Sequence, residues 1–210
     1  MAIIVPTITA ENPHQFREQV ERLQRFTGHV HLDLMDGIFT KNTGINLEQL
    51  WLPEDITCDV HAMYQNPEQV LEEVKKLSVR TFIVPAESEC DFKHFAEVLQ
   101  KAKMQFGVAL LAETPVESAK EAIEQADHVL IFSGNLGHQG GSMADLNLLD
   151  KISGIKTINP TAEIGWDGGV NIENVKRIAE AGVEIINVGS AIHFADNPER
   201  TYQELKQTIF

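Results

Sequence analysis

The sequence predicts an α/β fold built around eight parallel strands. Short apolar runs alternate with amphipathic segments along all 210 residues, as in repeated strand–helix units. Polar side chains also recur on one face of several predicted strands, where a sheet covered on both sides usually carries aliphatic residues. A doubly wound sheet and a closed barrel both fit this alternation. The count of eight and the polar inner faces favour the barrel, so we expect a single (β/α)8 TIM barrel over residues 1–210.

The strands are predicted where four to six mostly apolar residues stand between turn or helix signals. They fall at residues 3–8, 29–34, 57–62, 81–84, 106–110, 128–132, 162–166 and 184–188. No low-complexity stretch or shift of composition marks a linker between them, so one domain accounts for the chain.

Helix starts are marked by a capping residue before proline. These pairs are Asn12-Pro13, Asn66-Pro67, Thr114-Pro115 and Asn197-Pro198, and Gln15, Gln69 and Glu117 complete capping boxes for the first three. Further helices are expected at residues 91–103, 144–152 and 171–181, with a short one at 47–50.

The composition argues against several classes of binding partner and cellular location. With 31 acidic and 17 basic residues the net charge is −14, which disfavours nucleic acid and anionic membranes. Two cysteines, Cys58 and Cys90, are too few for a disulfide framework and fit a reducing cytosol. The first residues lack a signal-peptide pattern, and no apolar stretch is long enough to span a membrane. We therefore expect a cytoplasmic protein.

The second predicted strand carries charged side chains on a face that should be buried. Side chains alternate along a strand, so His31, Asp33 and Met35 share one face. A buried charge is costly unless it is paired, binds a metal or titrates. The strand ends at Asp36-Gly37, a turn signal. Because the active site of a parallel barrel lies at the carboxyl ends of its strands, this pattern predicts a site.

Two other strand ends repeat the pattern, with Asp59, His61 and Met63 on one face of the third strand and Asp167 at the end of the seventh. Each residue alone has an ordinary interpretation, as a core histidine, a turn aspartate or a packing methionine. Together they are hard to explain as packing, since each buried charge would need its own partner. We expect one divalent transition metal, such as zinc, iron, manganese or cobalt. Its ligands would be His31, Asp33, His61 and Asp167, with Met35 and Met63 packed above them.

Glycine-rich segments follow the last three strands. They are Gly137-His138-Gln139-Gly140-Gly141, Gly168-Gly169 and Gly189-Ser190. Glycine lets backbone N–H groups approach an anion, and loops after strands seven and eight of such barrels often bind phosphate. The three segments together predict a phosphate site.

These motifs resemble the ribulose-phosphate 3-epimerase family almost from end to end. The resemblance runs from Val5-Pro6-Thr7-Ile8 to Gly189-Ser190-Ala191-Ile192 and is most specific in the 31–37, 59–63 and 167–169 segments. It implies a metal-dependent 3-epimerase in which Asp33 and Asp167 are also the catalytic acid/base pair. D-ribulose 5-phosphate and D-xylulose 5-phosphate are the expected substrates, zinc is the preferred metal among the four, and a homo-oligomer is expected. The residues expected to contact substrate are Thr7, Met35, His61, Met63, Gly137, His138, Gln139, Gly140, Gly141, Gly168, Gly169, Gly189 and Ser190.

The sequence departs from the family pattern around the substrate. Phe132 replaces a third methionine, Pro85 a histidine and Leu111 an asparagine, and the segments 38–42 and 135–141 also differ. A hexulose 6-phosphate such as allulose 6-phosphate is therefore an alternative substrate, and a non-catalytic sugar-phosphate-binding barrel is a second alternative. Decarboxylase or aldolase chemistry on a related barrel is disfavoured, because Met35 stands where an Asp-x-Lys-x-x-Asp motif would place lysine.

Overall fold

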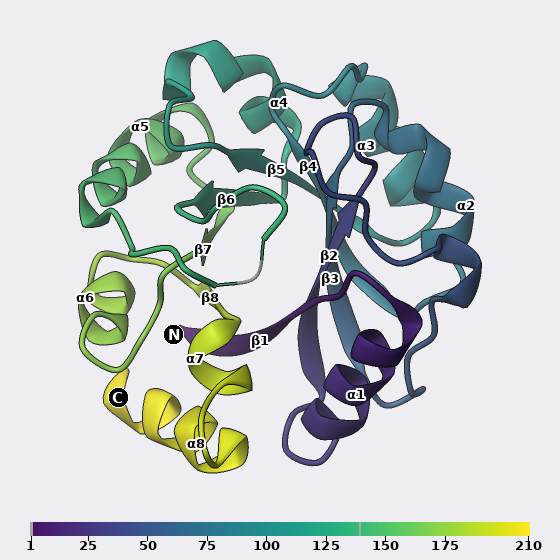
Figure 1. Cartoon of the computed structure of the whole chain (residues 1–210). Coiled ribbons are helices and arrows are strands. Elements are labelled where there is room, and N and C mark those ends of the chain that lie inside the picture. The colour runs from purple at the N-terminus through teal and green to yellow at the C-terminus, as the bar shows by residue number, and fades with distance from the viewer. Residues whose placement is uncertain (1, 139) are drawn as a thin grey trace.

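The computed structural model, which describes residues 2–138 and 140–210, is a closed barrel of parallel strands surrounded by helices (Figure 1). The strands follow one another in chain order from β1 to β8, and β8 pairs with β1 to close the ring. The predicted (β/α)8 barrel is confirmed. No helix in the described part of the chain is long and apolar enough to cross a membrane.

Each predicted strand is present, with its ends shifted by no more than two residues. The strands are β1 (Ile3–Thr9), β2 (His29–Met35), β3 (Thr57–Met63), β4 (Val79–Pro85), β5 (Gln105–Leu110), β6 (His128–Phe132), β7 (Glu163–Asp167) and β8 (Ile185–Val188). The helices are α1 (Pro13–Leu23), α2 (Leu71–Val74), α3 (Phe92–Lys101), α4 (Lys120–Gln125), α5 (Lys151–Ile158), α6 (Val175–Glu180), α7 (Ser190–His193) and α8 (Pro198–Thr208). Short 3-10 helices are η1 (Leu47–Gln49), η2 (Pro67–Val70), η3 (Val116–Ala119) and η4 (Leu146–Asp150).

The helix predictions were right in place but partly wrong in their caps and ends. Asn12 and Asn197 accept hydrogen bonds from backbone N–H groups of α1 and α8. The side chain of Asn66 makes no capping bond, and Thr114 instead donates its hydroxyl to Glu87. The corresponding segments begin as 3-10 turns, in which the cap geometry of an α-helix does not form. The helix expected at 144–152 is η4 followed by α5, and the one expected at 171–181 is α6, which begins at Val175.

Strand alternation divides the interior into two cores. Residues such as Leu32 and Trp166 point outward and pack in the large core between strands and helices. The barrel axis holds a much smaller apolar cluster of Ile83, Ala109 and Leu130. Polar side chains occupy the axis on both sides of that cluster, so the barrel has two polar ends separated by a thin apolar layer.

The amino end of the barrel is closed by a network of charged side chains. Arg80 donates two hydrogen bonds to Asp59, at 2.8 and 2.7 Å, and two more to Glu163, at 3.2 and 2.9 Å. His29 bonds the same aspartate and His128 bonds Glu163, both at 2.8 Å. The network therefore links β2, β3 and β4 to β6 and β7 across the barrel.

A bulge in β4 supplies the arginine. Cys58 pairs in register with Val79, and the next residue, Asp59, pairs with Thr81. Arg80 is thus the extra residue in β4. A bulge re-aims the side chain it adds, and here that side chain bonds the inward-facing Asp59.

Candidate metal centre and active-site pocket

The carboxyl end of the barrel brings together four side chains that the sequence predicted as metal ligands. His31 and Asp33 lie on β2, His61 lies on β3 directly beside Asp33 in register, and Asp167 ends β7. All four are buried, and alternation places them inside the barrel because Leu32, Leu34 and Val60 pack outward.

The donor atoms are spaced as ligands of one ion. One atom from each of the four residues lies within 4.8 Å of the others. Asp33 Oδ1 is 3.3 Å from His31 Nε2 and 3.4 Å from His61 Nδ1, and Asp167 Oδ2 is 4.0 Å from His31 Nε2. Ligand atoms in a tetrahedral zinc site, each about 2.1 Å from the ion, lie about 3.4 Å apart. Two imidazoles and two carboxylates therefore fit a divalent cation here.

Several of these atoms are buried without a hydrogen-bond partner. Among the described residues, neither nitrogen of His31 or His61 is bonded, nor is Asp33 Oδ1. The His31–Asp33 and His61–Asp33 contacts are close without the alignment of hydrogen bonds. Asp33 Oδ2, by contrast, accepts a hydrogen bond from the hydroxyl of Thr9 at 2.7 Å. Buried polar atoms are normally paired, so this cluster has the character of a binding site.

Burial and neighbouring charges shift the pKa values of the four side chains in different directions. Burial, reinforced by the negative charge of Asp33, raises the pKa of Asp167 to about 7. Burial would also raise the pKa of Asp33, but its contacts with His31 and His61 outweigh burial and lower it. Burial lowers the pKa of His61, whereas for His31 the two carboxylates outweigh burial and raise the pKa. The two carboxylates thus have opposite tendencies to hold a proton.

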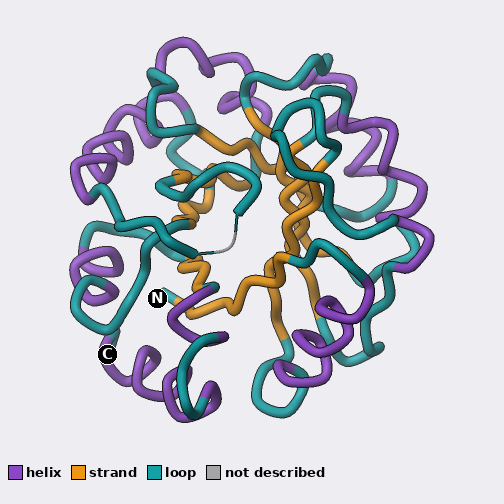
Figure 2. Tube along the Cα trace, viewed as in Figure 1, coloured by secondary structure: helices purple, strands orange, loops and turns teal. Residues whose placement is uncertain are grey.

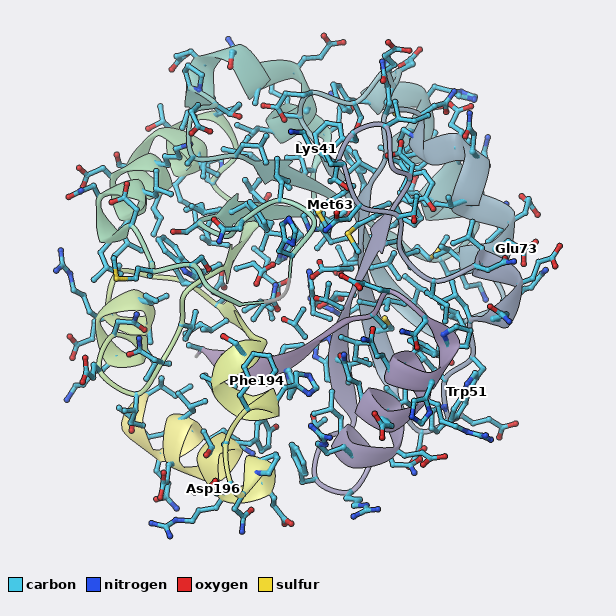
Figure 3. The ribbon with its side chains drawn as sticks, in the orientation of Figure 1. Lys41, Trp51, Met63, Glu73, Phe194 and Asp196 are labelled. Atoms are coloured by element: carbon cyan, nitrogen blue, oxygen red, sulfur yellow. The ribbon has the colours of Figure 1, made fainter. Side chains whose placement is uncertain are left out.

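A pocket opens above the cluster, and most of the predicted substrate-contacting residues line it. Its lining is Thr7, Thr9, Asp33, Met63, Phe132, Gly134, Asn135, Gly137, His138, Gly140, Ser142, Asp167, Gly168, Gly169, Val170, Asn187, Gly189 and Ser190. Met63 lies near the centre of the ring in Figure 3. His31 and His61 lie beneath the pocket with no exposed surface.

Besides His61, three predicted contacts are not among the described lining residues. Met35 is not in this lining; it borders a neighbouring cavity that also contains Arg22 and Phe194 and that shares Thr9 with the pocket. Gly141 is next to the lining without being part of it. Gln139 lies outside the described residues.

The glycines after β7 are required by close backbone packing. Gly168 and Gly169 have φ of +110° and +68°, which side chains rarely adopt. A Cβ on Gly168 would collide with the backbone of Gly134, and one on Gly169 with the backbone of Ala144. The β6 and β7 loops therefore pack backbone against backbone, which only glycine allows at these two positions.

The loop after β6 is tied to the loop after β2. Asn42 Nδ2 donates to Gly137 O at 2.7 Å and lies 3.1 Å from His138 Nδ1. In Figure 2 the β6 loop crosses the open end of the strand ring. Two segments that depart from the family pattern thus meet over the pocket.

Sequence reasoning missed several lining residues, among them the polar Thr9, Ser142 and Asn187. The signal was present for two of them, because Thr9 follows Thr7 by two residues on β1 and Asn187 follows Ile185 by two on β8. Ser142 lies in an irregular loop, where no periodicity predicts direction.

Comparison with known proteins agrees with these features. The sequence model described as the Ribulose-phosphate 3 epimerase family matches residues 3–193. Ribulose-phosphate 3-epimerase of Schizosaccharomyces pombe is 25% identical over 215 residues, covering 99% of this chain and 94% of the relative. That of Encephalitozoon cuniculi is 32% identical over 163 residues, covering 77% and 74%. The crystal structure of 3-hexulose-6-phosphate synthase from Salmonella typhimurium has a TM-score of 0.68 at 14% identity, covering 99% and 98%, and supports the barrel fold alone.

Proposed function

The chain belongs to the ribulose-phosphate 3-epimerase family, and from that premise we propose that it is a metal-dependent 3-epimerase of a ketose phosphate. One observation carries the proposal most: two carboxylates, Asp33 on β2 and Asp167 on β7, share a buried cluster with two unpaired imidazoles at the floor of the pocket. D-ribulose 5-phosphate and D-xylulose 5-phosphate are the proposed substrate pair. Zinc is the proposed ion, and a cytoplasmic homo-oligomer is the proposed form.

Epimerisation at C3 removes the proton beside the C2 ketone and returns one to the opposite face. Asp33 and Asp167 come from different strands, so each can serve one face of a planar enediolate. One carboxyl must begin ionised and the other protonated. The two carboxyl groups already differ in this sense in the metal-free protein, where the pKa of Asp33 is lowered and that of Asp167 is raised.

Two neighbouring side chains orient the catalytic groups and keep water away from them. The Thr9 hydroxyl donates to Asp33 Oδ2 and so directs the other oxygen, Oδ1, toward the two imidazoles. Phe132 packs against His61, with ring centroids 5.6 Å apart, and helps to exclude water from that side. A divalent cation held by His31, Asp33, His61 and Asp167 would supply positive charge to stabilise the developing oxyanion.

The phosphate would bind away from the reacting carbon. Gly140, Gly169 and Ser190 line the same pocket as the carboxylates, and their backbone N–H groups are the proposed phosphate ligands. Remote binding energy of this kind orients the substrate, so its loss lowers catalytic efficiency and not only affinity.

The test is solvent-exchange NMR in deuterated buffer. Purified protein is loaded with zinc, iron, manganese or cobalt and given ketose phosphates one at a time, with D-ribulose as the unphosphorylated control. We expect deuterium at C3 and formation of the epimer, fastest for the pentulose 5-phosphates. Chelation should abolish both, and D-ribulose should lose at least about 100-fold in kcat/KM.

Three results would contradict parts of the proposal. Deuterium exchange only with a hexulose 6-phosphate would show that the pentulose 5-phosphates are not the substrates. Equal turnover of D-ribulose and its 5-phosphate would contradict the proposed phosphate site. Binding of ketose phosphates without exchange under every metal would support a non-catalytic binding barrel.

A further inference from the structure

Asn187 on β8 is a buried amide that faces the pocket. It is 1% exposed and belongs to the pocket lining. Its neighbours Ile186 and Val188 pack in the core outside the barrel, so alternation turns Asn187 inward. Neither its oxygen nor its nitrogen is hydrogen-bonded by any residue in the ranges 2–138 and 140–210.

The position of Asn187 lies between two parts of the proposed site. In register it pairs with Asp167, the carboxylate proposed to act on C3. Two and three residues further along the chain come Gly189 and Ser190, which belong to the proposed phosphate end. A ketose 5-phosphate held between these points places one hydroxyl-bearing carbon, C4, between the reacting carbon and the phosphate-bearing carbon.

The chemistry of the side chain matches that hydroxyl. Burying an amide without a partner is unfavourable, and an aliphatic residue would avoid this, as Ile185 does one step earlier on the same face. An amide offers one acceptor oxygen and two N–H donors, whereas a hydroxyl both donates and accepts. The two groups can therefore satisfy each other.

We propose that Asn187 is a specificity-determining residue that binds the C4 hydroxyl of the ketose phosphate. The inference rests on the proposed epimerase function and adds a substrate contact to it. A site built to bond a hydroxyl discriminates strongly against the analogue that lacks it, because its own polar atoms are then left unpaired.

The experiment compares two substrates on three proteins. D-ribulose 5-phosphate and its 4-deoxy analogue are each followed by deuterium uptake at C3, using metal-loaded wild type, Asn187→Leu and Ile185→Val. The leucine keeps the branching of asparagine and removes both polar atoms. Ile185 lies on the same strand face and is absent from the described pocket lining, so Ile185→Val is the matched control.

We expect the wild type to prefer the hydroxylated substrate by at least 10–100-fold in kcat/KM, which corresponds to about 1.4–2.8 kcal/mol. Asn187→Leu should lose about that factor with D-ribulose 5-phosphate and little with the 4-deoxy analogue, so that its preference approaches one. Ile185→Val should keep the wild-type preference. Melting temperature gives a second readout: removing an unpaired amide should leave it unchanged or raise it.

Two outcomes would overturn the inference in different ways. A wild-type preference retained by Asn187→Leu, together with a lower melting temperature, would show that the amide is structural. That result would leave the epimerase proposal intact. Absence of deuterium uptake by the wild type with every ketose phosphate and metal would remove the proposed function, and this inference with it.

Discussion

The two polar ends of the barrel interior differ in how their charges are satisfied. At the amino end Asp59 accepts three hydrogen bonds, from His29 and Arg80, and Arg80 continues to Glu163. At the carboxyl end His31, His61 and one oxygen of Asp33 have no hydrogen-bond partner within the described residues. Burial differs as well: Asp59 is buried but His29, Arg80 and Glu163 are half-buried, whereas all four ligand candidates at the carboxyl end are buried.

The difference indicates that the paired charges at the amino end stabilise the fold and that the unpaired groups at the carboxyl end bind a ligand. A buried charge that has hydrogen-bond partners can be tolerated by the fold. A buried polar atom without a partner lowers the free energy of unfolding, and a ligand that bonds to it can remove this penalty. In parallel barrels the carboxyl end carries the chemistry and the opposite end carries stability. One unpaired atom, His128 Nε2, belongs to the amino end, and there Gly165 leaves the space that the ring occupies.

The largest expected effect comes from the carboxylates of the carboxyl end. Asp33→Asn and Asp167→Asn should each lower epimerisation by about 10³-fold, because general acid–base catalysis contributes about 10²–10⁴-fold. Each variant should still exchange deuterium into one epimer without inverting it, since the remaining carboxylate serves one face. Proton NMR with each epimer supplied separately, alongside metal analysis, measures this.

Asp59→Asn is the control at the other end of the barrel. It should keep kcat/KM per folded molecule within about twofold while unfolding at a lower temperature, as expected for a buried paired group. Near-normal epimerisation by both metal-loaded carboxylate variants would rule out the two-base mechanism.

An intermediate effect is expected at Arg80. Arg80→Met leaves Asp59 buried with His29 as its remaining partner, which should lower the free energy of unfolding by about 3 kcal/mol. The midpoint of thermal unfolding should fall by roughly 6–12 °C for a chain of this size. Arg200, which is exposed on α8 and paired with Glu204, is the matched control, because exposed pairs contribute about 0–1 kcal/mol. Equal melting temperatures for Arg80→Met and Arg200→Met would show that the network does not stabilise the barrel.

The smallest effect is the pH dependence of the amino end. Burial would raise the pKa of Glu163, but the hydrogen bond with His128 and the charge of Arg80 outweigh it and hold the pKa below its usual 4.5. The unfolded chain therefore takes up the proton first, and the stabilisation from Glu163 is complete above pH 4.5 and lost as the pH falls below it. Glu163→Gln should show a shallower loss of unfolding free energy between pH 5 and 3, measured by urea denaturation. Parallel curves for the two proteins would contradict the lowered pKa.

Much of the fold and part of the site follow from sequence patterns. Apolar runs and their alternation located every strand, and the position of His31, Asp33 and His61 on one face followed from a period of two. Patterns could not show that Met35 borders the neighbouring cavity, because alternation gives the face of the strand and not the position of the surrounding loops. They also could not show that Asn66 lacks a capping bond, or that a bulge joins Arg80 to Asp59, since both depend on local backbone geometry.

Because of the bulge at Arg80, the number of residues in β4 decides whether a cation lies between Asp59 and Glu163. Removing that one residue would leave Cys58 beside Val79 and Asp59 beside the present Thr81 in unbroken register, so the strand could still pair. The same deletion would remove the cation between Asp59 and Glu163. No point substitution makes both changes at once. A β4 strand taken from a barrel without this bulge would therefore still pair with its neighbours but would lack the cation that bonds Asp59 and Glu163. A sequence alignment that closes the one-residue gap would hide the cause of that loss.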